Sequence, residues 1–339
     1  MKSFVNTLQF GFILNLISFI SANAQTVVHE FIYEDAPFPS AHASTIAETP
    51  EGLVAAWFGG THEKHDDVGI WISRKGKTGW TTPEEVVNGV QHSNKRYPCW
   101  NPVLHYDGDL FLFYKVGPNP GEWWGEVTVS QDHGRTWDIA RRLPEDILGP
   151  VKNKAITLND GTWLCPSSTE HDGWQIHMER TRDRGLSWEL IGPLQADGEI
   201  DAIQPALLSL GGDSLMILCR SKKQGIVTSI SSDIGRTWTP LIPSGLPNPN
   251  SGIDAVTAKT GIHYLVYNPT STPDGEWGGD RFPLVLSKSE NGQDWTTVVT
   301  LEDEEGEYSY PAIIEGSDGT LHITYTWKRQ KVKHVVVSF

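Results

Sequence analysis

The sequence of 339 residues predicts an all-β fold built from repeated units, and three observations lead to this prediction. A short turn motif that ends in Trp recurs along the chain at a nearly constant interval. Runs of β-branched and aromatic residues, bounded by Gly, Asp and Pro, lie between the copies, for example at 110–115, 215–220, 264–267 and 321–327. The apolar periodicity of an amphipathic helix is almost absent.

The repeated motif has the form S-x-D-x-G-x-[ST]-W. Residues 130–137 and 231–238 fit it at every position, and residues 181–188 differ only in the first residue. Residues 73–80 lack the Asp, and residues 289–295 are one residue short. The closing Trp residues stand at positions 80, 137, 188, 238 and 295, which are 57, 51, 50 and 57 residues apart. Three good copies at a steady interval indicate a repeat architecture.

Each copy is expected to form a hairpin turn. The Asp side chain accepts backbone N–H bonds inside the turn, Gly supplies a positive φ, and Trp packs over the hairpin. Four short strands in a unit of about 50 residues are typical of a β-propeller blade. Residues 25–339 at roughly 52 residues per blade give six blades.

The last unit, after Gly306, has room for only three strands. Residues Thr26–Tyr33 form a lone strand ahead of the first unit. We expect this strand to become the outermost strand of the last blade and to close the ring, which removes an exposed edge. Residues 25–339 would then be a single domain. An open all-β array or a sandwich is the alternative.

Residues 1–24 are expected to be a signal peptide. Lys2 precedes a mostly apolar stretch, Phe10–Ile20, and the sequence Ala22-Asn23-Ala24 is typical of a cleavage site. This predicts an exported protein, either periplasmic or secreted. Three cysteines are an odd number for an oxidising compartment, and each lies in an apolar run, which favours buried free thiols. They are Cys99, Cys165 and Cys219.

The charge and the motif content exclude several classes of partner. Asp and Glu number 42 against 27 Lys and Arg, and the net charge of −15 argues against nucleic acid or an anionic membrane. No internal run reaches the 18 or so apolar residues of a membrane helix. Neither a CxxC nor an HExxH motif is present, so no metal and no cofactor are expected.

A polar residue recurs near the start of each predicted inner strand, where the blades of a propeller converge on its axis. Such residues either line a ligand site or hold the inner ends of the blades through buried hydrogen bonds, and both interpretations stay open. The candidates are His42, Asn101, Asn153, Gln204, Asp254 and either Tyr308 or Tyr310.

Basic residues gather near the same strands of this acidic chain. They favour a small acidic ligand at the axis, although pairing with Asp or Glu is the alternative. The basic residues expected to bind substrate are Arg96, Lys152, Lys154, Arg220 and Arg281, to which Lys115 and Arg329 can be added. Asn101, Gln204 and Asp254 are expected to contribute to the same binding site.

These motifs resemble the Asp-box, or BNR-repeat, sialidase-like family over essentially all of residues 25–339. The resemblance implies three arginines that hold a carboxylate, a Tyr nucleophile activated by a Glu, and an Asp that acts as acid and base. Arg220, in Leu-Cys-Arg-Ser ahead of a box, looks like the second of the three arginines. Arg281 looks like the third, and Tyr310 like the nucleophile.

The sequence departs from that pattern at three places. His42 stands where the first arginine is expected, and Gln204 ends a neutral stretch where the Glu partner of the Tyr is expected. The acid/base region, residues 60–67, offers Glu63, Asp66 and Asp67 as candidates. Because a Tyr without a base beside it is a weak nucleophile, the residues do not predict ordinary sialidase chemistry.

The remaining His, Tyr, amide and cationic groups suit proton abstraction beside the carboxylate of a uronic acid. We therefore expect an enzyme that acts on the terminal acidic sugar of oligosaccharides from an acidic polysaccharide, as a lyase or dehydratase. His42 would be the base or acid, with Tyr310 or Tyr308 as its partner. One alternative is an exo-glycosidase with Glu63, Asp66 or Asp67 as its acid. Another is a glycan-binding propeller without catalysis.

Overall fold

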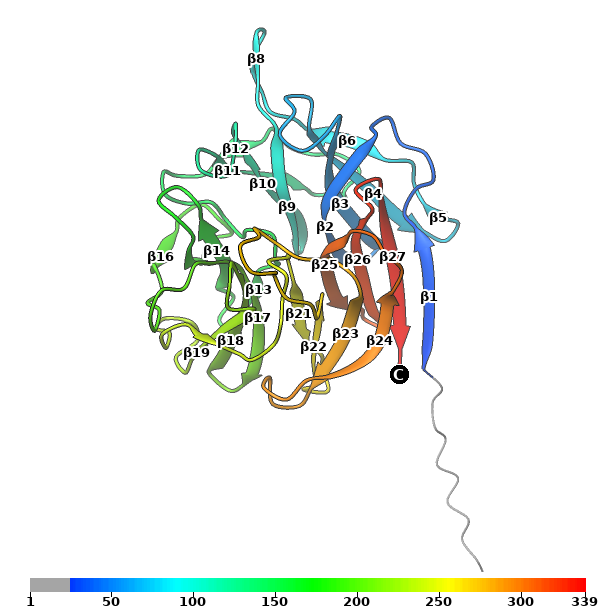
Figure 1. The fold of residues 1–339 in the computed structure, drawn as a ribbon. Coiled ribbons are helices and arrows are strands. Elements are labelled where there is room, and N and C mark those ends of the chain that lie inside the picture. Colours follow the sequence, from blue (N-terminus) through cyan, green and yellow to red (C-terminus); the bar gives the residue numbers. More distant parts are fainter. Residues whose placement is uncertain (1–24) are drawn as a thin grey trace, which may run out of the picture.

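The computed structural model describes residues 25–339, and this part of the chain contains β-strands and no α-helix. Six sheets stand around a central axis as the blades of a propeller (Figure 1). Five of them have four strands and one has five, and neighbouring strands within each blade are antiparallel. The predicted all-β fold with six blades is confirmed. The predicted signal peptide lies outside the described residues.

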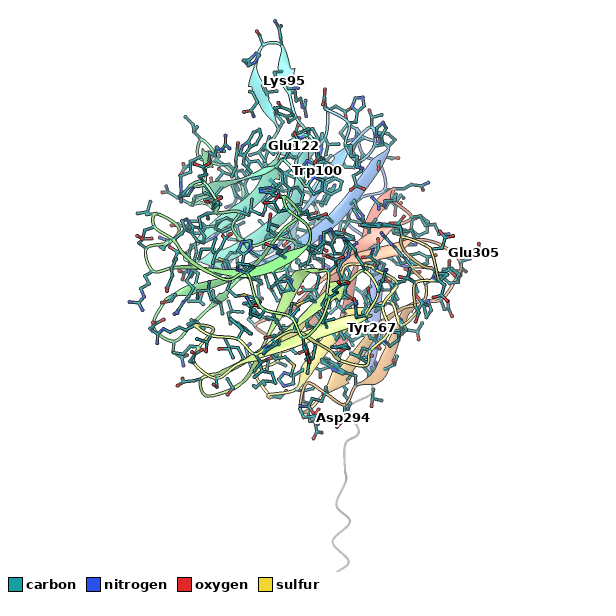
Figure 2. All side chains as sticks on the ribbon, turned by 60° about the vertical axis from the view of Figure 1, so that its left-hand side comes forward. Lys95, Trp100, Glu122, Tyr267, Asp294 and Glu305 are labelled. Carbon is teal, nitrogen blue, oxygen red and sulfur yellow. The ribbon has the colours of Figure 1, made fainter. Side chains whose placement is uncertain are left out.

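The first three blades follow the chain order, and β7 and β8 form a separate hairpin that projects from the ring. Figure 2 shows Lys95 on this hairpin. The strands are β2 (Ser40–Thr49), β3 (Gly52–Gly60), β4 (Gly69–Gly76), β5 (Gly79–Trp80) and β6 (Glu84–Val87) in blade 1, then β7 (Val90–His92) and β8 (Lys95–Arg96) in the hairpin, then β9 (Cys99–Asp107), β10 (Asp109–Val116), β11 (Trp124–Ser130) and β12 (Arg141–Arg142) in blade 2, and β13 (Ile156–Thr157), β14 (Trp163–Thr169), β15 (Gln175–Thr181) and β16 (Glu189–Ile191) in blade 3.

The other three blades repeat this order, and the last one takes its fourth strand from the start of the chain. The strands are β17 (Ala202–Gly211), β18 (Ser214–Ser221), β19 (Ile226–Ser231) and β20 (Ile242–Pro243) in blade 4, then β21 (Asp254–Thr257), β22 (His263–Tyr267), β23 (Leu284–Ser289) and β24 (Thr296–Glu302) in blade 5, and β25 (Tyr308–Glu315), β26 (Leu321–Trp327), β27 (Lys331–Ser338) and β1 (Thr26–Phe31) in blade 6.

The ring closes through β1, which lies beside β27 in Figure 1. The two strands are antiparallel, with Val28 opposite Val336. Glu30 of β1 then reaches blade 1, because it accepts a hydrogen bond of 3.1 Å from the Trp80 indole and pairs with Lys75. The predicted closure by the N-terminal strand is confirmed.

The repeated motifs form the predicted turns between the third and fourth strands of blades. In the copy at 130–137, Asp132 accepts bonds from the Thr136 amide (2.8 Å) and hydroxyl (2.6 Å), and Gly134 has a φ of 90°. Asp183 and Asp233 make the equivalent bonds. The Ser187 hydroxyl and amide lower the pKa of Asp183 to about 2, so this carboxylate stays ionised.

Apolar side chains fill the space between neighbouring blades. Trp163, for example, is buried between blades 2 and 3 with its ring edge against Phe111, at a centroid distance of 4.7 Å. The three cysteines are free and buried, and burial raises the pKa of each thiol. They therefore act as small apolar residues of the core.

The antiparallel order gives the ring two distinct faces. Each inner strand begins at one end of the ring, which we call the upper face. Because the second and third strands reverse direction in turn, the motif turns all lie at the opposite end, the lower face. The loops that lead from second to third strands therefore share the upper face with the starts of the inner strands.

Candidate active site

The inner strands are distorted where they begin, at the upper face. Ala43 in β2, Asn101 in β9, Gln204 in β17 and Tyr310 in β25 have φ values of 55°, 39°, 57° and 51°. The pairing register shifts at the same points in β2, β17 and β25. Left-handed backbone at a residue other than Gly is uncommon, and β-bulges of this kind redirect side chains next to functional sites.

Arg220, at the end of β18, is at the centre of the site. Its Nη1 donates to the Tyr310 hydroxyl (2.6 Å) and to Gln204 Oε1 (3.3 Å). Its Nε donates to Asn250 Oδ1 (3.0 Å). The residue is only 4% exposed, yet it forms no ion pair with an acid within residues 25–339. A buried arginine without a carboxylate partner is well suited to bind an anion.

Two further arginines approach from blades 5 and 6. Arg281 precedes β23, and its Nη1 donates to Glu307 Oε1 (2.8 Å). Arg329, in the turn between β26 and β27, donates to the same oxygen through Nε (2.6 Å) and to Glu63 Oε2 through Nη1 (2.6 Å). Burial opposes ionisation of Glu307, but Arg329 and Arg281 outweigh it and lower its pKa. The structure thus assembles three arginines, although the sequence pattern lacks the first.

His42, on β2, lies next to these groups and is only 2% exposed. Its Nδ1 is 2.9 Å from Thr326 Oγ1, and its ring packs on the Tyr310 ring at a centroid distance of 4.2 Å. Burial, followed by the charges of Arg329, Arg281, Arg220 and Lys152, lowers its pKa well below the usual range. The imidazole is therefore neutral near pH 7, so it can accept a proton but cannot replace the positive charge of an arginine.

Glu170 is a site residue that the sequence did not reveal. It lies in the loop between β14 and β15, where the Trp174 indole donates to its Oε2 (2.9 Å). Burial raises its pKa, while Arg220 and Lys222 act in the opposite direction. A carboxyl group that holds its proton more tightly is suited to general acid catalysis. No motif surrounds Glu170, and its charged neighbours are about 50 residues away in sequence, so no local signal marks it.

Aromatic residues border the site. Trp174 lies under the Arg220 guanidinium at 5.1 Å, and its ring meets that of Trp277 edge-on at 5.6 Å. Trp277 is 65% exposed. Its carbonyl accepts a hydrogen bond of 2.8 Å from the amide of Asn250, the residue that also holds Arg220. Exposed aromatic surface beside a charged cluster marks a binding edge.

Tyr308 and Tyr310 have different surroundings, and this separates the two tyrosine candidates. Tyr308 is 1% exposed, packs against Trp327, and belongs to the apolar cluster between blades 5 and 6. Its predicted role as a catalytic partner does not fit this position, because the register shift after Ser309 and the φ of 51° at Tyr310 turn the two tyrosines to different surroundings. Tyr310, the half-buried one, is the tyrosine in contact with Arg220 and His42.

Several predicted binding residues instead connect the blades. Lys154 pairs with Asp254 (2.9 Å), which also accepts bonds from the Ile313 and Ala255 amides. The Lys152 ammonium is buried and bonds to the carbonyls of Ile253 and Pro311, and burial lowers its pKa to about 7. Asn153 and Lys115 make similar buried hydrogen bonds. The Asn153 amide donates to the Gln204 carbonyl, and the Lys115 ammonium donates to the Pro150 carbonyl. These polar groups stabilise the inner ends of the blades.

The acid/base region divides into two parts. Glu63 reaches Arg329, as described above, whereas Asp67 is held by the Thr61 amide (3.0 Å) and hydroxyl (2.6 Å). Arg96 forms an ion pair with Glu85 of blade 1 (3.0 Å) and donates to the Asp67 carbonyl (2.6 Å). It is therefore not part of the arginine cluster. Asn101 lies on its inner strand as predicted, and its amide has no hydrogen-bond partner in the described part of the chain.

No group of three or more His, Cys, Asp or Glu side chains within residues 25–339 is arranged to hold a metal ion. A search for membrane-spanning helices over the same residues found none.

The fold and the axial cluster define a β-propeller of the sialidase-like class. The chain belongs to the BNR repeat-like domain family, whose model matches residues 51–323. No curated protein was found to match the sequence.

Solved structures share the fold at low sequence identity. A protein of unknown function from Dyadobacter fermentans has a TM-score of 0.72 at 15% identity, over 92% of this chain and 99% of that one. A mutant Trypanosoma rangeli sialidase with trans-sialidase activity gives 0.71 at 15%, over 92% of this chain and 58% of that one. The NanB sialidase of Streptococcus pneumoniae gives 0.70 at 11%, over 91% and 70%. The chain thus spans little more than half of the trypanosomal enzyme.

Proposed function

We propose that the protein is an enzyme that acts on the terminal carboxylated sugar of a glycan, and that the reaction is an elimination. The observation that carries this proposal is the convergence of three arginines on Tyr310 and a neutral His42. The similarity to sialidases supports a glycan as the substrate class. Residues 1–24 support a second part of the proposal, that the enzyme is exported.

Binding would depend chiefly on Arg220, which has no acidic partner to displace within residues 25–339. Arg281 and Arg329 share the carboxylate of Glu307, and Arg329 also pairs with Glu63, so the charge of these two arginines is matched by two acids and Arg220 is the arginine left for the substrate carboxylate. Neutralising a substrate carboxylate makes the C–H bond next to it more acidic, because the negative charge that develops on deprotonation is stabilised. The arginines would thus contribute both to binding and to the reaction.

Proton transfer would use Tyr310, His42 and Glu170. The neutral His42 would take the hydroxyl proton of Tyr310 as the Tyr310 oxygen, which accepts a hydrogen bond from Arg220, removes the proton from C5 of a uronic acid. His42 packs on the Tyr310 ring and provides a neutral proton acceptor nearby. The C5 electron pair then forms the C4–C5 double bond, the C4–O bond breaks, and Glu170 protonates the departing oxygen. The departing group is a glycan in a lyase and water in a dehydratase.

A hydrolase that uses the same site is the second candidate, and Glu170 is the observation that favours it. A carboxyl beside the arginines whose pKa is raised by burial is also what hydrolysis of a glycosidic bond requires of its acid. Glu63 is a further carboxylate at the site. Against hydrolysis stands the Tyr310 hydroxyl, whose side-chain partner is an arginine rather than a carboxylate.

Product analysis separates these proposals. The protein is incubated with oligosaccharides that end in glucuronate, galacturonate or sialate, and the products are analysed by mass and by ultraviolet absorbance. Elimination predicts an absorbing, unsaturated sugar, which is lighter by one water than the hydrolysis product for a lyase and lighter by one water than the intact substrate for a dehydratase. Release of a saturated acidic monosaccharide would establish hydrolysis instead. Absence of any product from the whole panel would refute both and leave a binding function.

A further inference from the structure

A second hollow opens on the upper face between blades 2 and 3, apart from the arginine cluster. Its volume is about 640 Å³, within the range of about 300 to 1,000 Å³ that is typical of small-molecule sites. The loop between β14 and β15 separates the two places. Glu170 and Trp174 of this loop face Arg220, whereas Thr169, His171 and Asp172 line the hollow.

One wall of this hollow is aromatic and fixed in place. The Trp124 indole donates to Glu126 (2.9 Å), and the Arg142 guanidinium covers its ring at 4.6 Å. Trp123 is buried edge-on against Trp100 at 5.9 Å, and its indole N–H has no hydrogen-bond partner in the described chain. These contacts fix both indoles in the wall of the hollow.

A buried acid holds a further part of the wall. Glu179 is fully buried and accepts bonds from the His177 ring (2.9 Å) and from the Leu148 amide (2.9 Å). His177 and Leu148 both line the hollow. Its wall is therefore preorganised, which reduces the entropic cost of binding.

The charge of the hollow is opposite to that of the arginine cluster. Among the described residues that line the hollow, four are acidic and one, Arg142, is an Arg or Lys, so an anionic sugar is disfavoured there. The acids are Glu122, Glu145, Asp146 and Asp172. Four of its polar side chains have no hydrogen-bond partner within the described residues and are exposed to an incoming hydroxyl-rich ligand. These four are Glu145, Asp146, Asp172 and Gln175.

From these observations we infer that the hollow between blades 2 and 3 is a second binding site, and that it binds a neutral saccharide. The half-buried Trp124 indole can contact an apolar side of a sugar ring, and carboxylate and amide groups accept or donate bonds to its hydroxyls. The inference goes beyond the proposed reaction and does not depend on it, because it concerns binding without turnover.

Calorimetric titration of the full protein tests this site. The probes are the neutral hexasaccharides cellohexaose, xylohexaose, mannohexaose, maltohexaose and N-acetylchitohexaose, with hexagalacturonate as the acidic comparison. We expect at least one neutral probe to bind. Trp124→Ala removes the indole, and Gln175→Trp fills the hollow, so each should weaken the affinity for that probe about tenfold or more. Arg220→Ala should change the same affinity less than about twofold. Thermal melting confirms that each variant is folded, and Gln175 is exposed, so its variant does not disturb the core.

Two results would overturn the inference. One is that no neutral probe binds at concentrations up to about 10 mM, because a dissociation constant above that value is too weak for specific recognition. The other is loss of neutral binding in Arg220→Ala together with retention in both variants of the hollow. Binding of hexagalacturonate answers the separate question of the arginine cluster, since it should depend on Arg220 and not on Trp124 or Gln175.

Discussion

The two faces of the ring are built from different kinds of contact. On the lower face, each turn is held by bonds within five residues of sequence, and the same bonds recur at Asp132, Asp183 and Asp233. On the upper face, Arg220 meets Tyr310 from 90 residues away, and Arg329 meets Glu63 from 266 residues away. The repeated turns stabilise a scaffold, whereas residues that do not repeat make the site. Changes on the upper face should therefore affect activity, and changes on the lower face should affect stability.

The largest effect is expected from Tyr310→Phe. The variant keeps the ring that packs on His42 and removes only the hydroxyl that contacts Arg220. Turnover should fall by about 10²- to 10⁴-fold, the usual contribution of a proton-transfer group, with an unchanged melting temperature. Tyr308→Phe, two residues away and buried between blades, is the matched control and should keep full activity. Equal losses in the two variants would contradict the division between site and scaffold.

Glu170→Gln is expected to have the next largest effect. In the wild-type enzyme, kcat should decline as pH rises through the raised pKa of this carboxyl, because the proton donor is lost. The Gln variant should lose about 10²-fold in kcat and should no longer show that alkaline decline. A pH profile of kcat measures both. An unaltered profile in the variant would remove Glu170 from the reaction.

Arg220→Ala should act mainly on substrate affinity. It removes a charge that has no acidic partner in the described structure, so the loss should fall on the bond to the substrate carboxylate. KM for an acidic substrate should rise about 10- to 100-fold. Steady-state kinetics on the acidic substrate and on its carboxyl-reduced form give the comparison. A similar rise on the reduced form would argue that Arg220 only supports the structure.

On the lower face, Gly235→Ala should lower stability and spare activity. Gly235 has a φ of 77°, and a β-carbon there would lie 2.6 Å from the Leu164 side chain of the next blade. We expect a loss of about 1–2 kcal/mol in the free energy of unfolding, measured by urea denaturation. The kcat of the folded fraction should match the wild type. A large fall in kcat would show that the two faces are coupled.

The smallest effect concerns the seam that closes the ring, where His322 stacks on His334 and His334 contacts Glu30 (2.7 Å). Burial and the neighbouring His334 lower the pKa of His322 from 6.5 to about 4. Between these pH values the unfolded chain binds more protons than the folded one, so stability should decrease as pH falls from about 6.5 to about 4. Urea denaturation across this range measures the slope, and His322→Gln should make it shallower. An unchanged slope in His322→Gln would show that another group causes the dependence of stability on pH.

The sequence was sufficient for the scaffold because the scaffold is local. Residues 130–137 contain every group that forms their turn, so spacing alone predicts the blades, their number and the closing role of β1. Of the site, Arg220, Arg281 and Tyr310 were named from the resemblance to the sialidase-like family, and the structure brings them to the upper face. His42 was also placed correctly at the upper end of the first inner strand.

The rest of the site depends on contacts between distant segments. Arg329, which the sequence offered only as an addition to the basic residues, completes the arginine cluster from a turn between β26 and β27 through contacts with Glu63 and Glu307 that no motif predicts. Glu170 and Glu307 become notable only through neighbours that the fold brings to them. Lys154 and Asp254 lie near an inner strand as predicted, but they form an ion pair with each other instead of facing a ligand. Sequence position predicts which face a residue occupies, but not which partner it finds there.

The central claim is that the arginine cluster acts on a sugar because that sugar has a carboxylate. The most direct test compares kcat/KM for an acidic oligosaccharide and its carboxyl-reduced form, in the wild type and in Arg220→Ala. Our account predicts that the wild type prefers the acidic form by about 10²-fold or more and that Arg220→Ala loses most of this preference. Equal kcat/KM values for the two substrates in the wild type would contradict it.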